Sequence, residues 1–157
     1  MSLLPQFPIE GGCACGAVRY RLDAPPLCVY VCHCTDCQTL TTSVFSLNGL
    51  VRAETHEVTQ GELKHWMRTA ASGNQIPQYV CAVCGVRIYT EPPQGSGMRT
   101  LRLGTLDDTR WLRPAAAIWM KSAQPWLAMP EGTLLYDAGA DDFGPIVRKW
   151  REMITPA

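Results

Sequence analysis

The chain has 157 residues, of which 46% are hydrophobic and 18% are charged, a composition typical of a folded globular protein rather than a disordered one. The 14 basic and 14 acidic residues balance, so the sequence lacks the basic surface that a nucleic-acid or membrane-surface partner would require. The first ten residues contain no Lys or Arg, and the longest apolar run, 115–120, is too short to cross a membrane. We therefore expect a cytoplasmic protein with neither a nucleic-acid nor a membrane partner.

Short apolar segments between turns rich in Gly and Pro predict a mainly β fold. Val18, Tyr20 and Leu22 alternate with arginines, which is the pattern of a half-buried strand. Further strands are expected, in chain order, at 27–31, 43–47, 62–68, 78–81, 86–90, 100–103 and 117–120.

The last segment has a different period. Apolar residues recur at helical spacing from Phe143 to Ile154, which predicts a short C-terminal helix. Asp141 or Asp142 can cap its start, and Pro145 is acceptable in its first turn. We expect its apolar face to pack on the sheet, with a homodimer contact as the alternative.

Eight cysteines are unusual in a cytosolic protein, where disulfides are rare, so metal binding is the expected explanation. One set consists of two short hooks, Cys13-x-Cys15 and Cys81-x-x-Cys84, each followed by glycine. Zinc prefers thiolate ligands in a tetrahedron, and two such hooks brought together by the fold would complete a four-cysteine site. Because that site has no open position, we expect it to be structural.

A second set lies in one continuous run, Cys32-His33-Cys34-Thr35-Asp36-Cys37. Three protein ligands with one exchangeable position is the arrangement of a catalytic zinc. The alternative is a second structural site with His33 as its fourth ligand. Cys28, within a predicted strand, is expected to be a small buried hydrophobic residue rather than a ligand.

Five sequence motifs, in this order and spacing, resemble those of the glutathione-dependent formaldehyde-activating enzyme family, which also includes a centromere protein V branch. The opening run GGCACGAVRY, the CHCTDC run and the CAVCG run resemble its first three motifs, and LGTLDD and IWMKSAQPW resemble its later signatures. The resemblance extends over about residues 11–137. The chain departs from the usual pattern at Gln38, where a basic residue is common, at Thr42, where glycine is common, and at Ala14, where histidine is frequent.

The resemblance implies a mainly β, Mss4-like (β-tent) zinc-binding fold with a short C-terminal helix, forming a single domain over 1–157 with a helical extension at 138–157. It also implies two Zn²⁺ ions per chain. The structural zinc would be held by Cys13, Cys15, Cys81 and Cys84, and the second, proposed catalytic zinc by Cys32, Cys34 and Cys37.

The activity implied by the family is that of a carbon–sulfur lyase acting on S-(hydroxymethyl)glutathione, the adduct of glutathione and formaldehyde. The expected partners are therefore a small-molecule thiol such as glutathione and an aldehyde. The alternative function is that of a non-catalytic Mss4-like zinc module that binds a protein partner.

Overall fold

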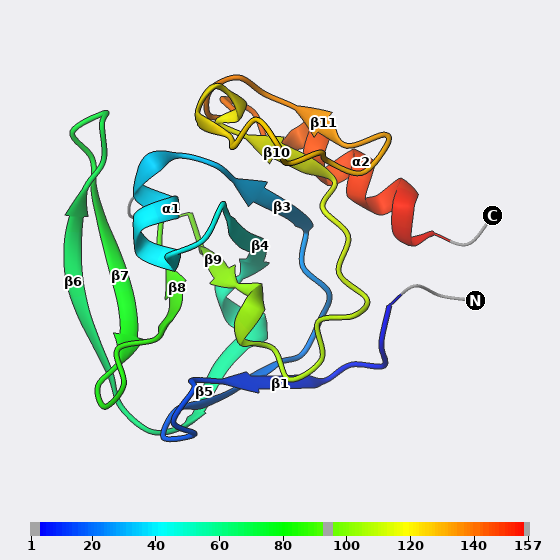
Figure 1. Cartoon of the computed structure of the whole chain (residues 1–157). Coiled ribbons are helices and arrows are strands. Elements are labelled where there is room, and N and C mark those ends of the chain that lie inside the picture. The colour runs from blue at the N-terminus through cyan, green and yellow to red at the C-terminus, as the bar shows by residue number, and fades with distance from the viewer. Residues whose placement is uncertain (1–3, 93–95, 156–157) are drawn as a thin grey trace. The chain divides into compact units, whose positions relative to one another are not determined.

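The computed structural model describes residues 4–92 and 96–155. Among these residues it contains eleven β-strands in two sheets and a short C-terminal helix, which confirms the expected mainly β fold (Figure 1). The chain divides into two compact units: the first includes residues 27–49 and the C-terminal part from residue 111, and the second includes 5–26 and 50–110. No helix in the described part of the chain is long and apolar enough to cross a membrane.

In the first unit, strand β3 (Cys28–Cys32) is the centre of the sheet. All five of its residues are buried, as expected for a strand covered on both faces. It pairs in parallel with β10 (Ala116–Ile118), which pairs in parallel with β11 (Leu134–Leu135). Strand β4 (Ser46–Arg52) lies on the other side of β3 and continues into the second unit.

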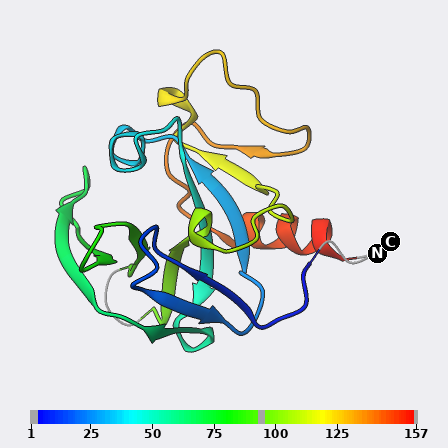
Figure 2. The ribbon, with the colours of Figure 1, turned by 60° about the horizontal axis from the view of Figure 1, so that its bottom comes forward.

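The C-terminal helix α2 (Gly144–Ile154) packs against β3, and its Ile146 and Trp150 are both buried (Figure 2). This confirms that its apolar face covers the sheet. The N-cap residue is Phe143, whose side chain makes no cap hydrogen bond, so the expectation of a cap at Asp141 or Asp142 was wrong by at least one residue. Asp142 instead accepts a hydrogen bond of 2.8 Å from the backbone N–H of Gly144, and Pro145 lies in the first turn as predicted.

The sequence did not predict helix α1 (Thr35–Thr41), which follows directly after β3. The side chain of Cys34 caps its start by accepting a hydrogen bond from the backbone N–H of Cys37. Thr42 ends the helix with φ of 49°, in the left-handed region that favours glycine. Because this helix and its cap occupy the chain up to Thr42, the strand expected at 43–47 begins only at Ser46, and that prediction was wrong at its start.

The second unit contains a three-stranded antiparallel sheet and the strands β6 to β9. The sheet has the order β1-β2-β5, formed by β1 (Ile9–Gly12), β2 (Arg19–Leu22) and β5 (His56–Gln60). The remaining strands have the order β9-β8-β7-β6, formed by β6 (Leu63–Thr69), β7 (Gln75–Cys81), β8 (Arg87–Thr90) and β9 (Met98–Arg102). The predicted alternation in β2 is confirmed, because Tyr20 and Leu22 are buried while Arg19 and Arg21 are partly exposed.

A buried histidine occupies the core of the second unit. His56 begins β5 and is only 3% exposed. Its ring meets those of Tyr20 and Tyr89 edge-on, with centroids 4.9 and 5.2 Å away, and Arg99 Nη1 lies 3.2 Å from its Nδ1. Burial and the nearby Arg99 charge lower the pKa of His56 to about 4.

We predict that Thr42→Gly leaves the protein at least as stable as the native chain. A left-handed conformation costs a non-glycine residue about 1–2 kcal/mol, whereas the added chain entropy of glycine costs about 0.4–1 kcal/mol. Ser43→Gly is the matched control, because Ser43 is also exposed and does not have a positive φ. The free energy of unfolding of Ser43→Gly, measured with urea, should be about 0.4–1 kcal/mol below that of the native protein. An equal decrease in both variants would contradict the strain at Thr42.

We predict that His56 makes the fold sensitive to mild acid. Its folded pKa lies below the unfolded value, so the unfolded state binds the proton first and stability is lost as the pH falls from about 6.5 towards about 4. Between pH 7 and 4, the free energy of unfolding should therefore fall by about 3 kcal/mol more in the native protein than in His56→Phe. Urea unfolding of both proteins, in the presence of chelator and at each pH, measures this difference in the free energy of unfolding. Titration of the cysteines affects both proteins equally and therefore cancels in the comparison. Parallel pH profiles would contradict it.

Candidate metal centre

The first cysteine cluster is assembled from two turns of the second unit. Cys13 and Cys15 lie in the turn between β1 and β2, while Cys81 ends β7 and Cys84 lies in the turn before β8. The four sulfur atoms all lie within 4.8 Å of one another. The two hooks, more than 60 residues apart in sequence, therefore meet as the spacing predicted.

The sulfur positions fit a tetrahedral metal site. Cys15 Sγ is 3.4 Å from Cys13 Sγ and 3.9 Å from Cys81 Sγ. A disulfide would need about 2.05 Å, and none of the eight cysteines forms one. With Zn–S bonds of about 2.3 Å, the edge of a regular tetrahedron is about 3.8 Å, so these separations match those of sulfurs sharing one ion.

Backbone amides point at the sulfurs of this cluster. The N–H of Val18 donates to Cys13 Sγ over 3.2 Å, and this is the main cause that lowers the pKa of Cys13 to about 6. Cys81 Sγ accepts from the N–H groups of Val83 and Cys84, at 3.4 and 3.5 Å. Such donors favour the thiolate, which is the form that binds metal.

A glycine with positive φ follows each hook. Gly16, after Cys15, has φ of 78°, and Gly85, after Cys84, has φ of 75°. An added Cβ would meet no atom within 4 Å at either position, so glycine is required for its backbone conformation and not for lack of space. Glycine is needed here because only it adopts the left-handed turn without strain.

The second cluster lies entirely in the first unit, where β3 passes into α1. Cys32 ends β3 and is buried, while Cys34 precedes α1 and Cys37 lies in its first turn, both partly exposed. Their sulfurs lie within 4.8 Å of one another, and the N–H of Cys37 donates to Cys34 Sγ over 3.3 Å. The nearby sulfurs of Cys34 and Cys37, together with burial, raise the pKa of Cys32 far above its ordinary value. Three thiolates can therefore coexist here only around a cation, so the donor set fits a bound metal.

His33 lies outside the second cluster, although it stands between two of the cysteines in sequence. Its ring is fully buried, with its centroid 5.5 Å from that of Phe45 in an edge-on contact, and burial lowers its pKa. Cys28 is fully buried in β3 and belongs to neither cluster, which confirms the prediction of a small hydrophobic core residue.

Sequence reasoning missed the residues that hold the second cluster in place. The amide nitrogen of Gln38 donates to the backbone oxygens of His33, at 2.7 Å, and of Ser122, at 2.8 Å. The hydroxyl of Ser122 donates to the same oxygen of His33, and Gln124 Nε2 donates to Gln38 Oε1, both at 3.1 Å. Two signals could have indicated this contact: the unusual Gln38, and the position of Ser122 and Gln124 in a family-like motif.

Comparison with protein families matches residues 8–122 to the family described as "Glutathione-dependent formaldehyde-activating enzyme". The chain belongs to this family. The matched residues include both cysteine clusters, Gln38 and Ser122, and end before α2. The resemblance to the centromere protein V branch stays a prediction.

A crystal structure of a Rhodobacter sphaeroides protein from a structural genomics programme has a similar fold. It is 16% identical in sequence, with a TM-score of 0.50, and the likeness covers 64% of this chain and 90% of that one. Comparison with curated proteins gave no match. Family membership and geometry together establish a member of this enzyme family with two cysteine clusters that could hold metal ions.

We predict that Gln38→Leu weakens metal binding at the second cluster by about 10–100-fold, the usual cost of losing a group that orients a metal ligand. Leucine is similar in size to glutamine but donates to neither carbonyl oxygen. Gln38→Lys keeps a donor for these oxygens and should recover most of the affinity. Competition with a chromophoric chelator measures the affinity of each site.

Gln124→Leu is the control for this prediction, because it leaves both donor bonds of Gln38 in place. Its metal affinity should stay close to that of the native protein. Equal losses in Gln38→Leu and Gln38→Lys, or a loss at the four-cysteine cluster instead, would show that Gln38 does not position the second cluster.

Proposed function

We propose that the chain is a zinc-dependent enzyme of the carbon–sulfur lyase type, acting on a thiol–aldehyde adduct such as S-(hydroxymethyl)glutathione. One observation carries the proposal: in a member of this family, the second cluster offers three thiol ligands rather than four, and two of them are partly exposed. A tetrahedral ion on such a cluster has one position left for a substrate.

The first cluster is assigned a structural zinc, held by Cys13, Cys15, Cys81 and Cys84. Four thiolates fill the tetrahedron, so this site has no position for substrate. Its ligands come from the β1–β2 turn and from the β7–β8 turn, which a shared ion would join. The free energy of zinc binding to such a site stabilises the folded state directly, because the unfolded chain does not present the preformed site.

The second cluster is assigned the reactive zinc, held by Cys32, Cys34 and Cys37. When bound, zinc supplies Lewis acidity, which lowers the pKa of a thiol ligand and polarises a carbonyl oxygen. Cys32 anchors the cluster from the buried end of β3, whereas Cys34 and Cys37 face the more open side. Gln38 and Ser122 fix the backbone of the intervening His33, so the three sulfurs keep their spacing while a substrate enters.

The reaction is balanced without any change in oxidation state. In the forward direction the thiol sulfur bonds to the aldehyde carbon, and the thiol proton ends on the carbonyl oxygen. In the lyase direction the same C–S bond breaks and the hydroxyl proton returns to sulfur. The protein therefore needs to hold the thiol as thiolate and to orient it, and no redox cofactor is required.

The ligand count also bears on the alternative of a non-catalytic zinc module. Such a module needs a fully ligated second ion, and His33 would be the nearest additional ligand in sequence. Its ring does not join the three sulfurs but packs on Phe45. This arrangement supports the enzyme over the binding module.

We predict that Cys34→Ser lowers the zinc content from two to one equivalent per chain and removes thiol-dependent turnover. Zinc is measured by elemental analysis, and turnover by NMR exchange between formaldehyde and its glutathione adduct, with the spontaneous rate subtracted. Cys28→Ala is the matched control, because it removes a cysteine outside both clusters, and it should keep two zinc ions and the activity.

Two outcomes would reject different parts of the proposal. If Cys34→Ser loses one zinc but keeps its activity, the second site is not catalytic. If the native protein does not accelerate adduct formation or breakdown with any thiol and aldehyde, the lyase activity is rejected while the zinc assignment stands.

A further inference from the structure

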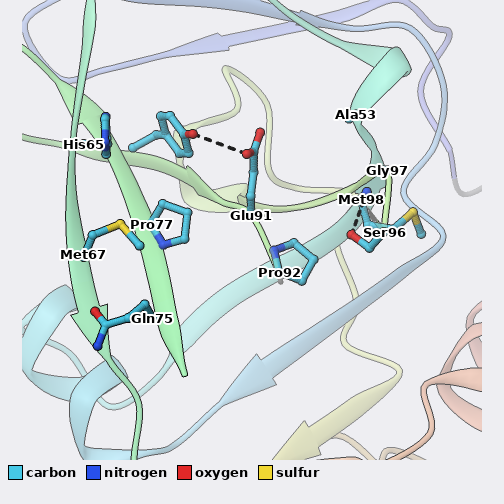
Figure 3. Close-up of a pocket in the computed structure, with 11 residues that line it drawn as sticks. Ala53, His65, Met67, Gln75, Pro77, Glu91, Pro92, Ser96, Gly97 and Met98 are labelled. Carbon is cyan, nitrogen blue, oxygen red and sulfur yellow. Dashed lines mark hydrogen bonds between the residues drawn. The ribbon is translucent and has the colours of Figure 1, made fainter. Parts of the chain in front are cut away.

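The second unit contains a cavity of about 530 Å³, which is within the usual range for small-molecule sites (Figure 3). It is lined by side chains of β6 and β7 on one side, and by residues 91–92 and 96–98 on the other. None of its lining residues is a cysteine of either cluster. The cavity is therefore separate from both candidate metal sites.

Part of the cavity wall is apolar and adaptable, although polar side chains also line it. Met67 on β6 and Pro77 on β7 are cross-strand partners, and Pro92 and Met98 line the facing segment. Met67 is 49% exposed, so its side chain is accessible to a ligand. A ligand in the cavity would cover apolar surface that is otherwise in water, and flexible thioethers adjust readily to its shape.

A carboxylate provides the polar anchor. Figure 3 shows Glu91 held by a hydrogen bond, in which the Tyr79 hydroxyl donates to Oε2 over 3.3 Å. Arg99 Nε donates to the other oxygen, Oε1, at 3.2 Å. A carboxylate has about four acceptor positions, so Glu91 is fixed from two sides and retains acceptor capacity towards the cavity.

The charges around the cavity select the ligand. Among its described lining residues there is no Lys or Arg, and Glu91 is the one carboxylate. Arg99 forms an ion pair with Glu91, donates to the backbone oxygen of His56 over 2.8 Å and lies 4.5 Å from the ring centre of Tyr89. Because Arg99 does not line the cavity and is held by these contacts, an anionic ligand would meet the Glu91 carboxylate with no cation of its own, whereas an ammonium group would share that carboxylate with Arg99.

We propose that this cavity binds a small primary amine with an apolar or aromatic body. The ammonium group donates to Glu91, and the body packs between Met67, Pro77 and Met98. This binding site goes beyond the proposed lyase activity, because it needs neither cysteine cluster and can be tested without turnover.

Three probes that share one body and differ in the head group test the proposal. Benzylamine, benzyl alcohol and benzoate are each titrated into ¹⁵N-labelled native protein at neutral pH. Benzylamine should shift the amide signals of 65–79 and 96–98 and bind at least tenfold more tightly than benzyl alcohol, a difference expected for a charge-assisted hydrogen bond. Benzoate should produce no saturable shifts there. Equal binding of all three, or shifts confined to other regions, would overturn the proposal.

Glu91→Gln should abolish the preference for the amine by removing the charge, while the control Glu62→Gln changes an exposed carboxylate that does not line the cavity and should leave binding unchanged. Because Glu91 also pairs with Arg99, its substitution could disturb the fold, so a second variant tests the proposal independently. Met67→Lys places a cation on an exposed wall residue, and it should reduce benzylamine binding at least tenfold. Unchanged benzylamine binding in both Glu91→Gln and Met67→Lys would also overturn the proposal.

Discussion

The close approach of sulfur atoms in two clusters is the interaction on which the rest of this structure depends. Neighbouring sulfurs lie 3.4–3.9 Å apart in the four-cysteine cluster and within 4.8 Å in the three-cysteine cluster; they form no disulfide, and they cannot all ionise without a cation between them. The strands around them act as the support that keeps these sulfurs together. In the second unit, β1 and β2 present one turn and β7 and β8 another, and the antiparallel pairing of each hairpin fixes where its cysteines lie.

The two clusters are supported in different ways. The four-cysteine cluster relies on elements within a few residues of each sulfur: amide donors such as the N–H of Val18, and the left-handed Gly16 and Gly85. The three-cysteine cluster relies on a distant part of the chain, because Gln38 reaches the backbone of Ser122, 84 residues away. The first kind of support is encoded locally, and the second exists only once the first unit has folded.

This difference explains how much the sequence could predict. Cysteine spacing and the flanking glycines were enough to group seven cysteines into the two observed clusters, and the two-residue period located β2. Helix α1 was missed because its seven residues are rich in threonine and its capping side chain is Cys34, which is not a typical helix cap. The burial of His56 gave no local signal either, since it results from tyrosines on other strands.

The contiguity of the second cluster also accounts for its having three cysteines rather than four. Its three cysteines lie within six residues, on the end of β3 and the first turn of α1, and this short peptide turns the ring of His33 away into the core. A fourth ligand would have to come from another segment, as Cys81 and Cys84 do for the first cluster. Among the described residues, the segment that approaches at 122–124 offers a backbone oxygen, a hydroxyl and an amide to Gln38 and His33, and no thiol or imidazole joins the cluster. The approaching segment thus stabilises the turn without adding a fourth metal ligand, which is the property that the proposed substrate-binding metal site requires.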